Sequence, residues 1–175
     1  IYNILISIGV VLFASAAFAG HHEAGENKAK TVIGYDTSEG VRAELYAGSV
    51  DTVAIWAKYM KAHDDNDLDA IRAANAEDFK AWPSDGRVLD GTDAQIEVLK
   101  DWFASANPRW VHQYSMANEF VAKDGKRQQW VTTGWELTET VDGQVSKSQD
   151  VFDVLIENGK IKTIYVATRA ILTAE

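Results

Sequence analysis

The chain has 175 residues, a formal net charge of −9 and no cysteine. This length suits one domain with an N-terminal extension. Nucleic acids and anionic membranes attract basic surfaces, so we do not expect an acidic chain without a Lys- or Arg-rich stretch to bind either. Without cysteine, disulfides, iron–sulfur clusters and thiol catalysis are excluded. The sequence has no zinc, phosphate-loop or nucleophile-elbow motif, and we expect no metal and no cofactor.

The first residues are typical of a secretory signal peptide. Residues 1–19 carry no charge, and their apolar run is too short for a comfortable membrane span. The run ends in the small-x-small cleavage pattern Ala17-Phe18-Ala19. We therefore predict a secreted or periplasmic protein with no membrane contact once the signal is removed. The alternative is a buried helix or an uncleaved anchor. Because the chain begins with Ile1 and not Met, we expect the natural start to lie upstream.

The next segment, residues 20–48, has weak periodicity and predicts a linker, with room for a short strand or turn packed on the domain. The domain itself is predicted over residues 49–175. Helical spacing of apolar residues predicts helices at about 50–64, 67–75 and 93–105, with a short edge hairpin at 85–91.

Two of these helices have capping signals. Ser49 is a suitable N-cap for the first helix. Thr92 and Gln95 have the spacing of a capping box on the third.

Three turn signals divide the last third of the chain into strands. Each of them lies between runs rich in β-branched and aromatic residues: Asp124-Gly125, Asp142-Gly143 and Asn158-Gly159. Asp-Gly and Asn-Gly tolerate the positive φ that two-residue hairpin turns require. The pattern predicts four consecutive antiparallel strands, at about 109–122, 127–140, 145–157 and 160–171.

Two-residue turns would also fix which side chains share a face of the sheet. In this register Tyr114 pairs with Trp135, Trp135 with Asp150, and Asp150 with Ala167. The predicted face is mostly apolar and needs the helices as cover. One end of it is polar and carries His112, Tyr114, Ser148, Asp150 and Arg169. The opposite face mixes polar side chains with large apolar ones, which predicts a homodimer through this outer sheet face.

The order helix, helix, short hairpin, helix and four-stranded meander resembles the nuclear transport factor 2-like superfamily, and its SnoaL-like branch most. The resemblance covers about 50–171 and rests on AIWAKYMKAHDDNDLDAI, NAEDFKAWPSDGRVLDG and DVFDVLIENGKIKTIYVATR. It implies a conical α+β fold in which three N-terminal helices pack on a curved, mainly antiparallel sheet that ends in a four-strand meander. It also implies a pocket between the helices and the concave face. Catalytic members place an Asp, His or Tyr in that pocket, and Asp150 and His112 match by position.

Asp150 is the first candidate for a functional residue. Burial in an apolar pocket would raise its pKa and prepare it as a general base, whereas an ion pair with Arg169 would lower the pKa and make the pair structural. Both alternatives stay open on the sequence alone.

His112 and Tyr114 are the other predicted catalytic residues, as a proton relay or oxyanion donors. Their alternatives are a hydrogen-bonded histidine and a half-buried tyrosine. The predicted ligand-binding residues are Arg169, Ser148, Trp135, Trp56, Tyr59, Phe79, Trp82, Trp110, Phe152 and Tyr165.

Three hypotheses about function follow. The first is an exported domain that binds a small, partly apolar molecule in a cone-shaped pocket. The second is a cofactor-free isomerase, dehydratase or hydrolase with Asp150 as the general base. The third is a non-catalytic dimerisation or association domain. The sequence contains no complete motif of one enzyme subfamily, so no reaction is selected.

Overall fold

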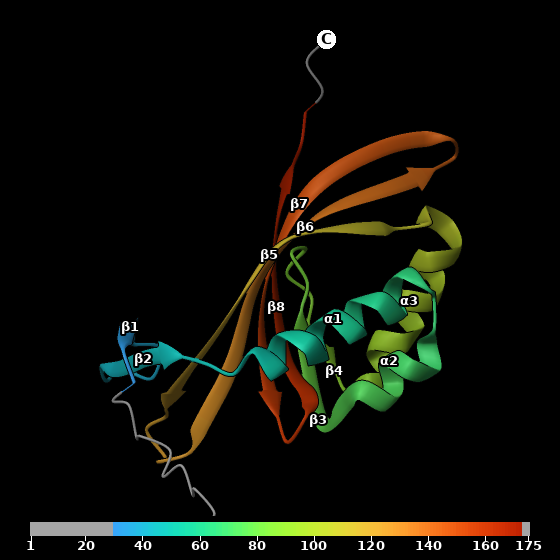
Figure 1. The fold of residues 1–175 in the computed structure, drawn as a ribbon. Helices are drawn as coiled ribbons and strands as arrows, with labels where there is room; N and C mark the ends of the chain where they lie inside the picture. Colours follow the sequence, from blue (N-terminus) through green and yellow to red (C-terminus); the bar gives the residue numbers. More distant parts are fainter. Residues whose placement is uncertain (1–29, 173–175) are drawn as a thin grey trace, which may run out of the picture.

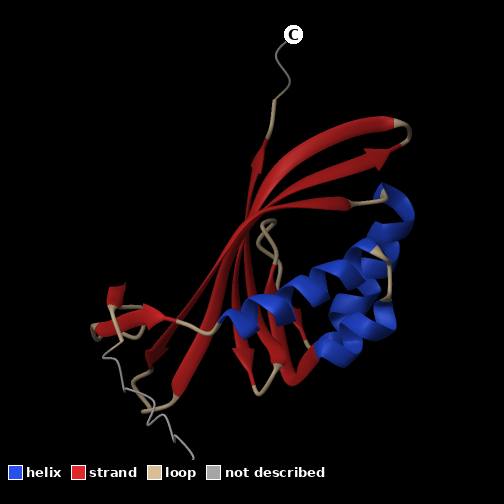
Figure 2. Cartoon of the chain, in the orientation of Figure 1, coloured by secondary structure: helices blue, strands red, loops and turns tan. Residues whose placement is uncertain are grey.

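The structure is a computed structural model that describes residues 30–172. Within this range one eight-stranded sheet curves around the helices, which lie together on its concave side (Figure 1, Figure 2). The strand order is β1-β2-β5-β6-β7-β8-β3-β4. The predicted α+β class with a curved, mainly antiparallel sheet is confirmed. The predicted signal peptide, residues 1–19, lies outside the described residues.

The helices form where helical spacing predicts them: α1 (Val50–Asp64), α2 (Leu68–Ala74) and α3 (Thr92–Ala106). Ser49 caps α1 by accepting a hydrogen bond from the Asp51 backbone. The capping box predicted for α3 is wrong, because Gly91 is the N-cap and Gln95 turns into the core, where its amide donates to the Tyr59 hydroxyl. No helix within residues 30–172 is long and apolar enough to cross a membrane.

Two short hairpins flank the meander. β1 (Val32–Asp36) and β2 (Ala43–Ala47) pair in the segment predicted as a linker, and β2 extends the sheet beside β5. β3 (Asn75–Trp82) pairs with β4 (Leu89–Asp90) and runs parallel to β8. This parallel pairing adds β3 and β4 to one edge of the sheet, where both strands contact α3.

The meander consists of β5 (Arg109–Val121), β6 (Arg127–Val141), β7 (Gln144–Glu157) and β8 (Lys160–Ala170). Its middle hairpin has the predicted register. Asp142 and Gly143 both have positive φ, 51° and 78°, as a two-residue turn requires. Trp135 consequently pairs with Asp150.

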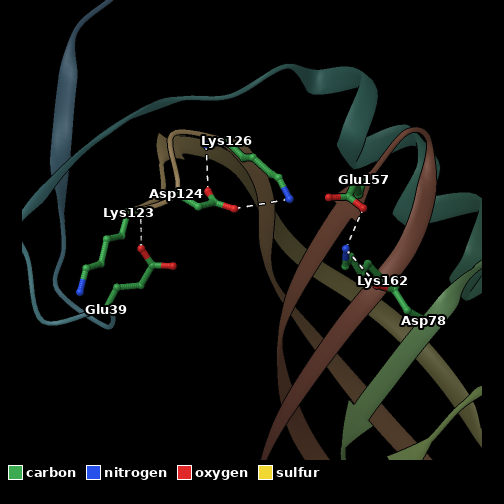
Figure 3. A network of polar contacts seen from close by, with 7 residues as sticks. All are labelled: Glu39, Asp78, Lys123, Asp124, Lys126, Glu157 and Lys162. Atoms are coloured by element: carbon green, nitrogen blue, oxygen red, sulfur yellow. Dashed lines mark hydrogen bonds and ion pairs between the residues drawn. The ribbon is translucent and has the colours of Figure 1, made fainter.

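The β5–β6 hairpin differs from the prediction by one residue. The Asp124 carboxylate accepts a hydrogen bond of 2.9 Å from the Lys126 backbone, and of this turn's residues only Gly125 has positive φ (Figure 3). The loop is therefore a three-residue turn and not a two-residue one. A shift of one residue moves every side chain of a strand to the other face, so Tyr114 pairs with Gly134.

A β-bulge at Gln113 partly reverses this shift. Gln113 has no partner on β6, and beyond it His112 pairs with Trp135 and Trp110 with Leu137. Trp110 and His112 therefore lie on the concave face, as predicted, while Tyr114 stays on the convex one.

A second bulge changes the register of β8. The turn at Asn158-Gly159 has the predicted two residues, but Lys162 has no partner on β7. Its ammonium contacts Glu157 at 2.7 Å and Asp78 at 3.1 Å, which holds the extra residue at the sheet surface (Figure 3). Beyond the bulge Asp150 pairs with Thr168 and not with Ala167. The predicted register of this part of β8 is wrong.

Candidate functional site

A cavity of about 580 Å³ lies between the helices and the concave face of the sheet. This volume is within the usual range of small-molecule pockets. Side chains of α1, α3, the β3–β4 hairpin and the strands β5 to β8 line it. They are Trp56, Tyr59, Met60, His63, Ala81, Pro83, Ser84, Asp85, Arg87, Leu89, Gln95, Val98, Asp101, Trp102, Ser105, Trp110, Leu137, Glu139, Ser148, Asp150, Phe152, Ile164, Val166 and Thr168.

One wall of the cavity is a continuous series of aromatic rings. Trp56 lies between Phe152 and Tyr59, with both centroid distances at 5.3 Å. Tyr59 contacts His63 at 4.6 Å, and His63 contacts Trp110 at 5.8 Å. Trp110 meets Trp102 edge to face, at 5.3 Å and 80°. Helical spacing explains the α1 part of this series, because residues three and four apart share a face.

Asp150 on β7 is the buried carboxylate of the cavity, with 4% of the residue exposed. Its Oδ1 accepts a hydrogen bond of 2.7 Å from the Thr168 hydroxyl, and its Oδ2 has no hydrogen bond to a described residue. Burial raises the pKa of Asp150, and the nearby Glu139 carboxylate adds to this rise, although Thr168 and Trp110 act in the opposite direction. The protein therefore provides a hydrogen bond to only one of the two oxygens of this carboxylate, which we call half-satisfied.

Two indole N–H groups around the cavity are also unpaired. The Nε1 atoms of Trp56 and Trp110 are buried and have no partner of ordinary hydrogen-bond geometry among the described residues. The Trp110 N–H is near enough to Asp150 to favour the ionised form of this carboxylate. The contact does not have the geometry of a hydrogen bond, so the Trp110 N–H is a free donor. Buried polar groups are usually paired, so free donors in a cavity wall indicate room for an acceptor on a ligand.

Tyr59 is held by a buried polar chain. Its hydroxyl accepts a hydrogen bond of 2.7 Å from Gln95, and the Gln95 carbonyl accepts one of 2.7 Å from Asn75. Burial raises the pKa of Tyr59, so the phenol stays neutral. The sequence pattern did not predict this role of Gln95, because Thr92 and Gln95 have the spacing of a capping box.

His63, near the end of α1, lines the cavity but is not among the predicted site residues. Its Nδ1 donates to the Tyr59 carbonyl at 2.9 Å, and burial lowers its pKa to about 4. The imidazole is consequently neutral at pH 7. Its spacing from Trp56 and Tyr59, seven and four residues, is the signal that could have placed it on the buried face of α1.

Six of the predicted site residues line the cavity: Asp150, Ser148, Trp56, Tyr59, Trp110 and Phe152. Phe79 does not, because its side chain is fully buried in the core. Trp82 and Tyr165 stack on each other at 4.7 Å. Tyr165 pairs with the exposed Asp153, on the face of the sheet opposite to Asp150, so the pocket position predicted for these two rings is wrong.

The ion pair between Asp150 and Arg169, one of the two alternatives that the sequence leaves open, does not form. The bulge at Lys162 places Arg169 opposite Gln149, on the convex face, where its guanidinium donates a hydrogen bond of 2.7 Å to the Gln149 carbonyl. Asp150 is therefore free of the ion pair that would have lowered its pKa.

The other two predicted catalytic residues lie outside the cavity lining. Tyr114 lies on the convex face over Gly134. His112 is exposed, contacts the Trp135 ring edge to face at 4.8 Å and forms a 2.9 Å hydrogen bond with Ser115. Trp135 belongs to this group and not to the cavity wall. The structure thus leaves Asp150 without His112 or Tyr114 beside it in the cavity.

No protein-family model and no curated protein matches this chain. Solved structures do. An LEH-like epoxide hydrolase of M. tuberculosis has a TM-score of 0.58 at 12% identity, over 69% of this chain and 84% of that one. A protein of Catenulispora acidiphila with a ketosteroid isomerase-like fold, in complex with trimethylamine, has a TM-score of 0.52 at 13% identity, over 65% of this chain and 83% of that one.

A third structure is described as a SnoaL-like polyketide cyclase of a Jannaschia species. It has a TM-score of 0.52 at 17% identity, over 68% of this chain and 83% of that one. These identities are too low to transfer an activity, but the three structures share one architecture. The chain therefore has the nuclear transport factor 2-like fold that its sequence predicts.

Proposed function

We propose that this domain binds a small, partly apolar molecule between α1, α3 and the concave face of the sheet. The observation that carries the proposal is the half-satisfied Asp150 carboxylate in the wall of a cavity of about 580 Å³. A buried charge without a partner is costly, and such groups gather at functional sites. The trimethylamine complex of one structure with this fold is consistent with a small ligand. An association domain would instead be expected to fill its cone with side chains.

Mass spectrometry tests this proposal on the full chain purified under non-denaturing conditions. We expect a bound mass that is present in the native spectrum and absent after denaturation. Val98→Trp should remove it, because Val98 lines the cavity and an indole would occupy the space. Val111→Trp, on an exposed position of β5, is the matched control. A Val98→Trp protein that folds and still carries the same mass would reject the cavity as the binding site.

The raised pKa of Asp150 favours a second candidate function, cofactor-free isomerisation, dehydration or hydrolysis with Asp150 as the general base. In this version Tyr59 takes the donor position that the sequence predicts for Tyr114, because Tyr59 lines the cavity and Tyr114 does not. Asp150→Asn should then abolish turnover. Unchanged turnover would reject the assignment.

Two further proposals concern the whole protein. We propose that it is exported after cleavage behind Ala19, and the intact mass of secreted or periplasmic material tests this. We also propose a homodimer through the convex face of the sheet. Trp130 and Tyr165 stack there at 6.2 Å, and Tyr165 is 45% exposed.

A further inference from the structure

The charged side chains around the cavity are mostly acidic. Among the described residues 30–172, four carboxylates line it, and the only basic lining residues are Arg87 and His63. Arg87 is already paired with one of the four, Asp85, at 2.6 Å. His63 is neutral at pH 7, because burial lowers its pKa to about 4. The cavity lining therefore offers no free positive charge to its remaining carboxylates.

Those three carboxylates are Asp101, Glu139 and Asp150. None of them has a cationic side chain within 4 Å in the described part of the chain. The Glu139 carboxylate is near enough to Asp150 for its charge to add to the rise in the pKa of Asp150. Like charges at the edge of a low-dielectric cavity repel each other unless a cation lies between them.

The aromatic wall meets these carboxylates at one end of the cavity. The Trp102 indole donates a hydrogen bond of 2.6 Å to Glu139, and the Trp110 indole lies beside Asp150. The planes of the two indole rings meet at 80° and form a corner, and the carboxylates of Glu139 and Asp150 lie beside this corner. Indole faces attract cations, and the attraction is strongest where water is excluded.

We infer that the molecule held in this cavity is an organic cation, an amine on an apolar body, with its ammonium group between Asp150, Glu139 and the corner of Trp102 and Trp110. The inference rests on the proposed function, because it names the chemical class of ligand for the same cavity. The apolar body lies against the inner part of the aromatic wall, formed by Trp56, Tyr59 and Phe152. A neutral ligand of the same shape would leave the carboxylates uncompensated, and an anion would be repelled.

Three probes with one aromatic body and different charge test the inference. They are 2-phenylethylamine, 2-phenylethanol and phenylacetate, titrated into the full chain at pH 7 by calorimetry. We expect the amine to bind at least about tenfold more tightly than the alcohol, the scale of one desolvated cation–π contact or charge pair. Phenylacetate should bind weakest.

Matched variants locate the effect. Glu139→Gln and Asp150→Asn should each bring the affinity for the amine towards that for the alcohol. Asp153→Asn is the control, because Asp153 is on the same strand as Asp150 but is exposed on the convex face, where it accepts a hydrogen bond from Thr132. It removes the same charge from the protein and should leave the preference unchanged. Circular dichroism verifies that each variant is folded.

The outcomes separate the two proposals. If the alcohol binds as tightly as the amine, or if Asp153→Asn weakens the preference as much as Asp150→Asn, the cation assignment is overturned and a small-molecule pocket remains. If none of the three probes binds and no bound mass is found, both proposals are overturned. A preference for the amine that both cavity variants remove supports the inference.

Discussion

Asp150 shows the balance between stability and function on the scale of one residue. Its ionised form is penalised by burial, and only Thr168 donates a hydrogen bond to it. Because the folded-state pKa of Asp150 is above the usual value, its charge lowers the free energy of unfolding at neutral pH. This penalty is relieved as the pH falls through the folded-state pKa. A residue retained under such a penalty is a strong candidate for ligand contact.

Asp150→Asn should therefore stabilise the protein at neutral pH. An asparagine keeps the acceptor for Thr168 and removes the buried charge, and we expect a gain of about 0.5–2 kcal/mol, the usual range for a successful single stabilising change. Urea unfolding at pH 7 and at acid pH measures it. The gain should shrink at acid pH, where Asp150 itself is protonated. A loss of stability at pH 7 would contradict the buried-charge account.

His63 gives a pH prediction of the opposite sign. Its folded-state pKa of about 4 is below the ordinary value of 6.5. Between pH 6.5 and pH 4, His63 is protonated in the unfolded chain but stays neutral in the folded one. The free energy of unfolding therefore falls as the pH drops from about 6.5 to about 4. The loss attributable to His63 reaches about 3 kcal/mol at most.

His63→Phe should flatten this part of the stability curve. The ring fits the same contacts with Tyr59, Phe103 and Trp110 but does not titrate. Urea titrations of both proteins at several pH values provide the difference, in which the contribution of other groups cancels. Equal slopes for the wild type and the variant would show that His63 is not the buried titrating group.

At the scale of elements, the faces of β5 and β8 are set by bulges. Gln113 and Lys162 each lie opposite no residue of the neighbouring strand. Each bulge exchanges the two faces for the rest of its strand. Because Lys162 is the unpaired residue of β8, Thr168 lies opposite Asp150 and Arg169 lies on the convex face, outside the cavity. One unpaired residue thus decides whether the candidate site contains a free carboxylate or an ion pair.

Gly134→Ala tests the register of β5 directly. A Cβ at this position would collide with the Tyr114 ring, which covers Gly134 on the convex face. We expect a loss of about 1–3 kcal/mol, the usual cost of overpacking. In the Tyr114→Ala background the same change should cost much less, so a double-mutant cycle of unfolding free energies measures the coupling. If the two changes are additive, Tyr114 does not cover Gly134.

At the scale of the whole molecule, the sheet divides the protein into two sides. The helices lie on the concave side (Figure 1), where the cavity is also found. The convex side carries the stacked rings of Trp82, Trp130 and Tyr165. Tyr165 is exposed and the two indoles are half-buried. Large apolar side chains grouped in this way on one face are typical of interaction surfaces. The site and the proposed dimer interface therefore use opposite faces of the same strands.

We predict that the purified protein is a dimer and that Tyr165→Glu makes it monomeric. A carboxylate at this position would have to lose its water in the proposed interface. Tyr35→Glu on β1 is the matched control, because Tyr35 is exposed to a similar extent but lies far from the stacked rings in the sheet order. Size-exclusion chromatography with light scattering gives the mass. A monomeric wild type at micromolar concentration would contradict the prediction.

The three helices and the four strands of the meander follow from the sequence, because their signals are local. Helical spacing places α1 and α3, and Asp142-Gly143 places Trp135 opposite Asp150 without help from the rest of the chain. The aromatic side chains of α1 and the buried Asp150 could likewise be assigned to one site from their spacing and the alternation of β7.

Only the tertiary structure decided what surrounds Asp150. The three-residue turn at Asp124-Gly125 uses the same dipeptide as a two-residue turn, and the bulge at Lys162 has no signal of its own because its contacts come from β3 and β7. A shift of one residue reverses a whole strand face, so these two choices moved Tyr114 and Arg169 to the convex side. Local residue patterns determine where strands begin and end, whereas contacts between distant segments determine which face of each strand meets the cavity.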